Sequence, residues 1–254
     1  MIVELGDGYS SRSQIARRIT EGWGAKSLFC AACDSDTLEP TTANTKAIDF
    51  RCPRCASGYQ LKAGKQRIGA RIPDGAYSAM TTAILSDNVP NLLVLQYTPA
   101  WQVRNLQLVP SFLFSASMIE KRKPLGPDAR RAGWIGCNIH LAALPACARI
   151  PIVSDGIATS AKDSRAQYQK LRPFSFIPPL IRGWTLDVFR IVQSLGVPTF
   201  SLTDVYRHEH QLSVLHPQNK NVRPKIRQQL QVLRDVGFLN FNGDGQYTLV
   251  SNKR

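Results

Sequence analysis

The sequence lacks any continuous apolar run of about 18 residues, which is the length that a membrane-spanning helix needs. Its first residues lack the basic-then-apolar layout of a signal peptide. Internal repeats and low-complexity tracts are missing as well. We therefore expect neither a membrane protein, nor a secreted protein, nor a repeat array. The expected location is the cytoplasm, where thiols stay reduced.

Acidic side chains are scarce, with 18 Asp and Glu against 32 Lys and Arg, so the formal net charge is +14. An excess of this size predicts a polyanionic partner or an anionic membrane surface. Hydrophobic residues make up 43% of the 254 residues, which is usual for a globular protein and argues against disorder. This length suits one large domain, or a medium domain and a small one, with a core that needs no metal or disulfide to form.

The segment 171–183 (LRPFSFIPPLIRG) contains three prolines, which cannot continue a helix or fill a central strand. We interpret it as a linker between a first domain, residues 1–182, and a second domain, residues 183–254. The first domain mixes helical and strand patterns, so we expect an α/β fold with a mixed sheet. Helices are expected over 11–23 and 74–85, the second capped by Asp74, and strands over 47–50, 59–62, 91–98, 106–109 and 149–153.

The second domain has a clearer pattern, in which three helices precede a β-hairpin. Its helices are expected over 185–195, over 201–210 and over 224–236, and its strands over 238–241 and 246–249. The four residues between these strands, NGDG, suit a turn. This order is typical of a winged-helix domain, a variant of the helix-turn-helix.

Four of the six cysteines form two Cys-x-x-Cys pairs, Cys30/Cys33 and Cys52/Cys55, which are separated by eighteen residues. This spacing is typical of a zinc site with four thiolate ligands. Because four sulfurs leave no open coordination position, the zinc is expected to be structural rather than catalytic. The two remaining cysteines show no such pattern and are expected to be small buried side chains.

Polar residues that suit phosphodiester hydrolysis flank the second cysteine pair. Asp49 precedes it, and Gln60 and Lys62 follow it in the next expected strand. A hairpin through this turn would place them together, where a carboxylate and a nearby oxygen can hold Mg²⁺ with waters. A lysine there can orient the attacking water and stabilise the phosphate charge. By itself this spacing also fits an ordinary hairpin with solvated polar residues.

Two basic segments are candidate DNA-binding surfaces. The stretch 121–134 combines cations with Pro, Gly and an indole, which suits a loop that follows phosphates, and its candidates are Arg130, Arg131 and Trp134. The last expected helix is rich in Arg, Lys and Gln, which read guanine and adenine in the major groove. Its candidates are Arg223, Lys225, Arg227, Gln228 and Gln229. The alternatives are a solvated loop with a tryptophan in the core for the first segment, and a solvated helix face for the second.

Several segments resemble the DpnI-like methyl-directed restriction endonucleases. They are SQIARRITEGW, the two cysteine pairs around IDF, QLK, DGAY, RKPLGPDARRAGWIGCNI, RGWTL and KIRQQLQVLRD, spread from residue 13 to residue 235. The resemblance implies a PD-(D/E)xK nuclease domain with an inserted zinc site, followed by a winged-helix domain. It also implies Mg²⁺-dependent cleavage of double-stranded DNA at GATC sites with N6-methylated adenine, in a prokaryotic cytoplasm. We expect the chain to be a monomer.

The resemblance also implies roles for individual residues. Asp49 matches the metal-binding aspartate of the family and Lys62 its catalytic lysine, whereas Gln60 stands where the family usually has a glutamate. A neutral amide offers an oxygen without a charge, so we expect weaker metal binding and a retained activity that is either weakened or favours Mn²⁺. Leu61 would add its backbone carbonyl as a magnesium ligand. Trp134 matches a tryptophan that packs near the methylated bases in this family.

Two other functions are compatible with the sequence. In the first, the nuclease site has decayed at Gln60 and the protein only binds methylated DNA through its winged helix. In the second, the protein is a transcription regulator whose zinc part serves dimerisation. The regulator ranks last, because it leaves Asp49, Lys62 and the basic loop without a role.

Overall fold

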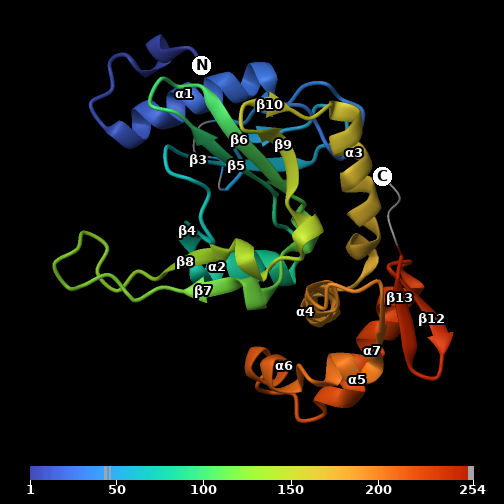
Figure 1. Cartoon of the computed structure of the whole chain (residues 1–254). Helices are drawn as coiled ribbons and strands as arrows, with labels where there is room; N and C mark the ends of the chain where they lie inside the picture. Colours follow the sequence, from blue (N-terminus) through green and yellow to red (C-terminus); the bar gives the residue numbers. More distant parts are fainter. Residues whose placement is uncertain (43–44, 46, 251–254) are drawn as a thin grey trace.

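The computed structural model describes residues 1–42, 45 and 47–250. Its largest sheet has the strand order β1-β2-β3-β5-β6-β9-β10, in which β3 and β5 are parallel and the other neighbours antiparallel (Figure 1). The expected α/β domain with a mixed sheet is therefore confirmed. The strands are β1 (Glu39–Pro40), β2 (Phe50–Arg51), β3 (Gly58–Gly64), β5 (Asn91–Tyr97), β6 (Val103–Val109), β9 (Ile150–Ser154) and β10 (Ile157–Ala158).

Two helices pack on this sheet, α1 (Arg12–Ser27) against β3 and α3 (Ala161–Leu171) against β9. A Cβ on Gly24 of α1 would lie 2.6 Å from the ring of Phe50, so glycine is needed for this close approach. No helix in the described part of the chain is both long and apolar enough to cross a membrane. Short 3-10 turns cover Val3–Gly6, Ser111–Leu113, Ala116–Met118, Leu141–Ala143, Ala146–Ala148 and Arg172–Phe176.

A second sheet shows that the helix expected over 74–85 is partly wrong. Arg71–Ala76 form strand β4, and only Tyr77–Leu85 form helix α2. Asp74 therefore lies in a strand instead of capping a helix, because β4 pairs with a strand far along the chain that no local pattern reveals. The sheet has the order β4-β8-β7, with β8 (Gly136–His140) and β7 (Ile119–Lys121).

The C-terminal part has the expected winged-helix order, with two additions. The helix expected over 201–210 is two helices, the first of which begins at a capping box formed by Ser201 and Asp204. Strand β11 adds a third strand to the hairpin, in the order β11-β13-β12. The elements are α4 (Pro179–Ser194), β11 (Thr199–Ser201), α5 (Leu202–Tyr206), α6 (Glu209–Leu215), α7 (Val222–Asp235), β12 (Leu239–Gly243) and β13 (Gln246–Leu249).

The segment expected to be a linker is mostly helical. After α3 ends at Leu171, a 3-10 turn follows and α4 begins at Pro179, so α4 crosses the expected boundary between residues 182 and 183. A proline is tolerated in the first turn of a helix, where its missing N–H would have no partner. Pro179 therefore starts α4, and the helix expected to begin at residue 185 begins earlier.

A buried arginine ties the beginning of α4 to the end of α2. The side chain of Arg182 is 2% exposed and donates to both carboxylate oxygens of Asp87, at 2.7 and 3.0 Å. It also donates twice to the carbonyl of Ile177, at 3.0 and 2.8 Å. Because a buried guanidinium is stable only when its charge and N–H groups are paired, this cluster holds α4 on the N-terminal domain.

Replacing Asp87 by alanine should lower the free energy of unfolding by about 2 kcal/mol, since the buried guanidinium of Arg182 would lose two hydrogen-bond acceptors. Asp87→Asn should cost less, because asparagine keeps an acceptor and tolerates the left-handed backbone at this position (φ 55°). Urea denaturation followed by fluorescence measures both variants. Unchanged stability of Asp87→Ala would contradict the role of this ion pair.

Candidate active site, zinc site and DNA-binding surfaces

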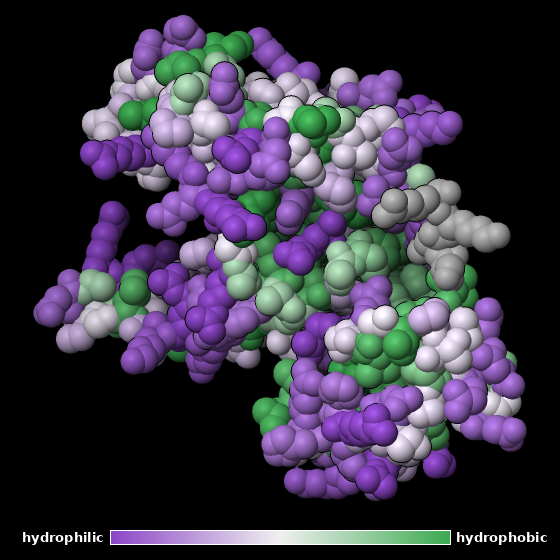
Figure 2. Space-filling view, viewed as in Figure 1, coloured by the Kyte–Doolittle hydropathy of each residue, from purple (hydrophilic) through white to green (hydrophobic). Residues whose placement is uncertain are grey.

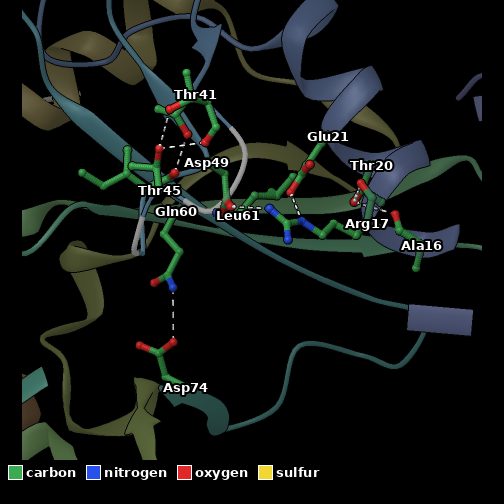
Figure 3. A network of polar contacts seen from close by, with 12 residues as sticks. Ala16, Arg17, Thr20, Glu21, Thr41, Thr45, Asp49, Gln60, Leu61 and Asp74 are labelled. Carbon is green, nitrogen blue, oxygen red and sulfur yellow. Dashed lines mark hydrogen bonds and ion pairs between the residues drawn. The ribbon is translucent and has the colours of Figure 1, made fainter. Parts of the chain in front are cut away.

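The carboxylate of Asp49 lies at the edge of β3. Asp49 directly precedes β2, and its backbone N–H donates to the carbonyl of Tyr59 at 2.8 Å. Its Oδ2 accepts the backbone N–H of Leu61 at 2.7 Å (Figure 3). Backbone groups alternate along a strand, so the N–H and the carbonyl of Leu61 point to this same edge. The structure thus brings together two of the predicted magnesium ligands, the Asp49 side chain and the Leu61 carbonyl.

Gln60 and Lys62 lie two residues apart and therefore share one face of β3. Both reach Asp74 of β4, which had been expected at a helix cap. The amide Nε2 of Gln60 donates to Oδ1 of Asp74 at 3.2 Å, and Lys62 Nζ lies 2.5 Å from the same oxygen. Figure 3 shows the side chains of Gln60 and Asp74 pointing toward one another. The sequence pattern identified the neighbourhood of Asp49, Gln60 and Lys62 but missed Asp74.

Helix α1 contributes a cation next to the carboxylate of Asp49. Arg17 donates to Glu21 at 2.6 Å, and its guanidinium lies 3.9 Å from Oδ1 of Asp49. The hydrogen bond to Glu21 and the charge of that carboxylate raise the pKa of Arg17. A cavity of about 570 Å³ opens here between α1 and the segment before β2. Arg17 and Glu21 are functional candidates that the spacing of residues did not indicate.

The donor atoms at this point of β3 fit a hard divalent cation. Mg²⁺ prefers oxygen ligands, and here they are the Asp49 carboxylate, the Leu61 carbonyl and the amide oxygen of Gln60. The amide nitrogen of Gln60 is already bound to Asp74, which leaves its oxygen for another partner. Lys62, on the same strand, adds an ammonium group that can stabilise negative charge on a phosphate.

The four predicted zinc ligands converge in space. The sulfur atoms of Cys30, Cys33, Cys52 and Cys55 all lie within 4.8 Å of one another. Sγ of Cys30 is 3.6 Å from that of Cys55, and Sγ of Cys33 is 3.5 Å from that of Cys52. A tetrahedral site with Zn–S bonds of about 2.3 Å requires sulfur separations of roughly 3.8 Å, so the cluster fits zinc.

The thiols of this cluster differ in acidity. Burial raises the pKa of the Cys30 thiol well above its usual range. Burial acts in the same direction on Cys52, but the backbone N–H groups of Cys55 and Arg54 outweigh it and lower its pKa to about 6. Because zinc binds thiolates, metal binding to this cluster releases protons.

We predict that the chain carries zinc and that chelation unfolds the region around β2 and β3. If zinc is present at a thousandfold its Kd, its removal should lower the free energy of unfolding by about 4 kcal/mol. Metal analysis and thermal melting measure this for the parent chain and for Cys33→Ala. Cys147→Ala is the control outside the cluster, and equal zinc content in both variants would contradict the site.

The predicted loop residues lie on a projection between β7 and β8 (Figure 1). Arg130 and Arg131 are exposed and Trp134 is partly buried. The guanidinium of Arg131 lies 4.8 Å from the centre of the Trp134 ring, and a Cβ on Gly136 would come within 2.8 Å of that ring. Figure 2 shows mostly hydrophilic side chains on this projection and a notch between it and the surface above.

Helix α7 presents most, but not all, of its predicted DNA-binding residues. Four of the five are exposed or half-buried: Arg223, Lys225, Arg227 and Gln228. The expectation that Gln229 contacts DNA is wrong, because this side chain is fully buried and accepts a hydrogen bond from Thr185 of α4 at 2.7 Å. It lies on the buried stripe of α7, and its partner is 44 residues away, which local periodicity does not reveal.

A basic cavity was not indicated by the sequence at all. It has a volume of about 570 Å³, and Arg67, Arg104 and Arg149 line it together with Gln96 and Gln107. The register places Val94 opposite both Lys62 and Gln107, so Gln107 faces the same side of the sheet as Lys62. The three arginines come from separate elements, and only strand pairing brings them together.

Two comparisons with known families cover nearly all of the chain. The DpnI family, described as the Dam-replacing family, matches residues 1–175. The Dam-replacing HTH domain matches residues 181–249. The first match contains the cysteine cluster and the carboxylates beside β3, and the second contains the winged helix.

Proposed function

This chain belongs to the Dam-replacing (DpnI) family, and we propose that it is a methylation-dependent restriction endonuclease that cleaves double-stranded DNA at GATC sites with N6-methylated adenine. The proposal is supported by the side chains around the middle of β3, where the Asp49 carboxylate accepts the N–H of Leu61 and both Gln60 and Lys62 contact Asp74. The family match supports a methyl-dependent restriction enzyme, and the HTH match supports DNA binding. The GATC site, Mg²⁺ and the monomeric state are part of the proposal.

The positive charge of the chain supplies the first step, a salt-dependent capture of DNA. The projecting loop, the basic cavity and α7 offer exposed arginines for phosphate contacts. α7 enters the major groove, where the N6-methyl group of adenine lies. The indole of Trp134 provides a flat apolar surface for a methyl group, a contact of about 0.8 kcal/mol. Because one such contact gives only a small preference for methylated DNA, a second element must also recognise the site, and α7 supplies it.

Asp49, Gln60 and Leu61 would hold Mg²⁺ through oxygen atoms beside the scissile phosphate. When bound, the metal ion supplies a Lewis acid and an acidified water. Lys62 orients the attacking water and stabilises the negative charge that develops on the phosphate. Arg17 lies on the Asp49 side of the site, where its positive charge attracts phosphate.

Asp49→Ala and Lys62→Ala should each lower the cleavage rate by roughly 100-fold or more, since Asp49 would hold the metal ion and Lys62 stabilises the negative charge on the reacting phosphate. DNA affinity should change little, because phosphate contacts elsewhere supply most of it. Digestion of methylated and unmethylated plasmid with Mg²⁺ or Mn²⁺ tests the function, and Lys170→Ala on α3 is the charge-matched control.

The digestion also separates the enzyme from a second candidate function. This second candidate is a protein that only binds methylated DNA. The observation that favours it is the neutral amide of Gln60 at a position where the family usually has a carboxylate. Fragments from methylated plasmid alone support the nuclease. A retarded but intact plasmid supports the reader. A parental cleavage rate in either alanine variant contradicts the assignment of these two residues.

Gln60→Glu is the reverse experiment. A carboxylate in place of the amide adds negative charge to the metal site, so Mg²⁺ should support faster cleavage at lower concentration. Titration of Mg²⁺ at fixed DNA concentration measures the change, and Mn²⁺ serves as a reference with higher intrinsic affinity. An identical Mg²⁺ dependence in both chains would show that residue 60 does not contact the metal.

A further inference from the structure

Asp74 is a nearly buried carboxylate that contacts both polar side chains of β3. Its side chain is 7% exposed, and it lies on β4, in a different sheet. A single atom, Oδ1, accepts the amide N–H of Gln60 at 3.2 Å and lies 2.5 Å from the ammonium of Lys62. Burial of a carboxylate at this depth is costly unless it is paired, so these two contacts explain its presence.

The contact with Gln60 has a chemical consequence, because the two ends of an amide differ. The NH₂ group can only donate and the oxygen can only accept, whereas an ionised carboxylate can only accept. Asp74 therefore binds the nitrogen end and turns the oxygen end away from itself. A cation needs that oxygen, since an NH₂ group has no lone pair to offer it.

We propose that Asp74 is a positioning residue that presents the amide oxygen of Gln60 to the cation and holds the ammonium of Lys62 beside it. This inference rests on the proposed function, because it gives the neutral Gln60 a way to serve as a metal ligand. A glutamate at position 60 has oxygen atoms at both ends and needs no such orientation. The role of Asp74 in metal binding is thus tied to the amide.

A double-mutant cycle tests this dependence. Asp74→Ala should weaken Mn²⁺ binding to the zinc-loaded chain by roughly 10- to 100-fold, the usual cost of losing a group that orients a metal ligand. In a chain that carries Gln60→Glu, Asp74→Ala should not weaken Mn²⁺ binding. Asp74→Asn keeps an acceptor oxygen and should restore binding close to that of the parent chain. Calorimetry without DNA gives the Mn²⁺ affinity.

Cleavage kinetics and a control complete the experiment. Asp74→Ala should lower kcat with little change in KM for DNA, because the buried carboxylate contacts catalytic groups rather than the DNA surface. Glu39→Ala removes an exposed carboxylate from the same domain and should leave Mn²⁺ affinity unchanged. Thermal melting identifies a variant that has lost its fold. If Asp74→Ala does not fold, Asp74→Asn is compared with the parent chain instead.

The outcomes are distinct. An equal loss of Mn²⁺ affinity in the Gln60 and Gln60→Glu backgrounds would assign Asp74 a merely structural role and overturn the inference. Parental affinity in Asp74→Ala, or no Mn²⁺ binding by the parent chain, would overturn it as well. A chain that binds Mn²⁺ with the predicted dependence but leaves methylated DNA intact would refute the nuclease proposal and leave this inference standing.

Discussion

The register of β2 against β3 is the constraint on which the candidate site depends. It is fixed by the backbone bond from Asp49 to Tyr59 and by the bond from the Leu61 N–H to the Asp49 carboxylate. A shift by one residue would turn Gln60 and Lys62 to the opposite face of the sheet. Cys52 and Cys55 lie in the connection between these strands. A zinc ion bound to them would fix this turn and thereby the register of β2 against β3.

Charge is arranged so that cations reach outward and the carboxylates of the site stay close to the sheet. Exposed arginines occupy the projecting loop, the basic cavity and α7, whereas Asp74 is buried and Asp49 is paired with a backbone N–H. A polyanion is therefore attracted from a distance and meets the Asp49 carboxylate beside β3. This arrangement suits a protein that must bind DNA and still hold a cation against it.

A buried ion pair connects the two domains. Arg182 belongs to α4 but is paired with Asp87 at the end of α2, so the winged helix and the sheet β4-β8-β7 are linked through a buried ion pair. The projecting loop grows from that same sheet. In the proposed function, the loop and α7 are two readers of methylated DNA whose relative position this link maintains, and their small individual preferences combine.

The sequence by itself determined the features that rest on short spacings. The two cysteine pairs, the apolar run of β5, the amphipathic stripe of α7 and the neighbourhood of Asp49, Gln60 and Lys62 are all local patterns, and each could be predicted because periodicity and ligand spacing act within a few residues. Membership of the family could also be recognised from its motifs.

Only the tertiary structure decided which side chains those local elements meet. Asp74 joined the candidate site because β4 pairs with β8, and Gln229 left the DNA-binding surface because it bonds Thr185. The basic cavity was assembled by strand pairing as well. Each of these outcomes depends on a partner far along the chain, and the free energy of pairing and burial outweighs the local preference that a sequence pattern reports.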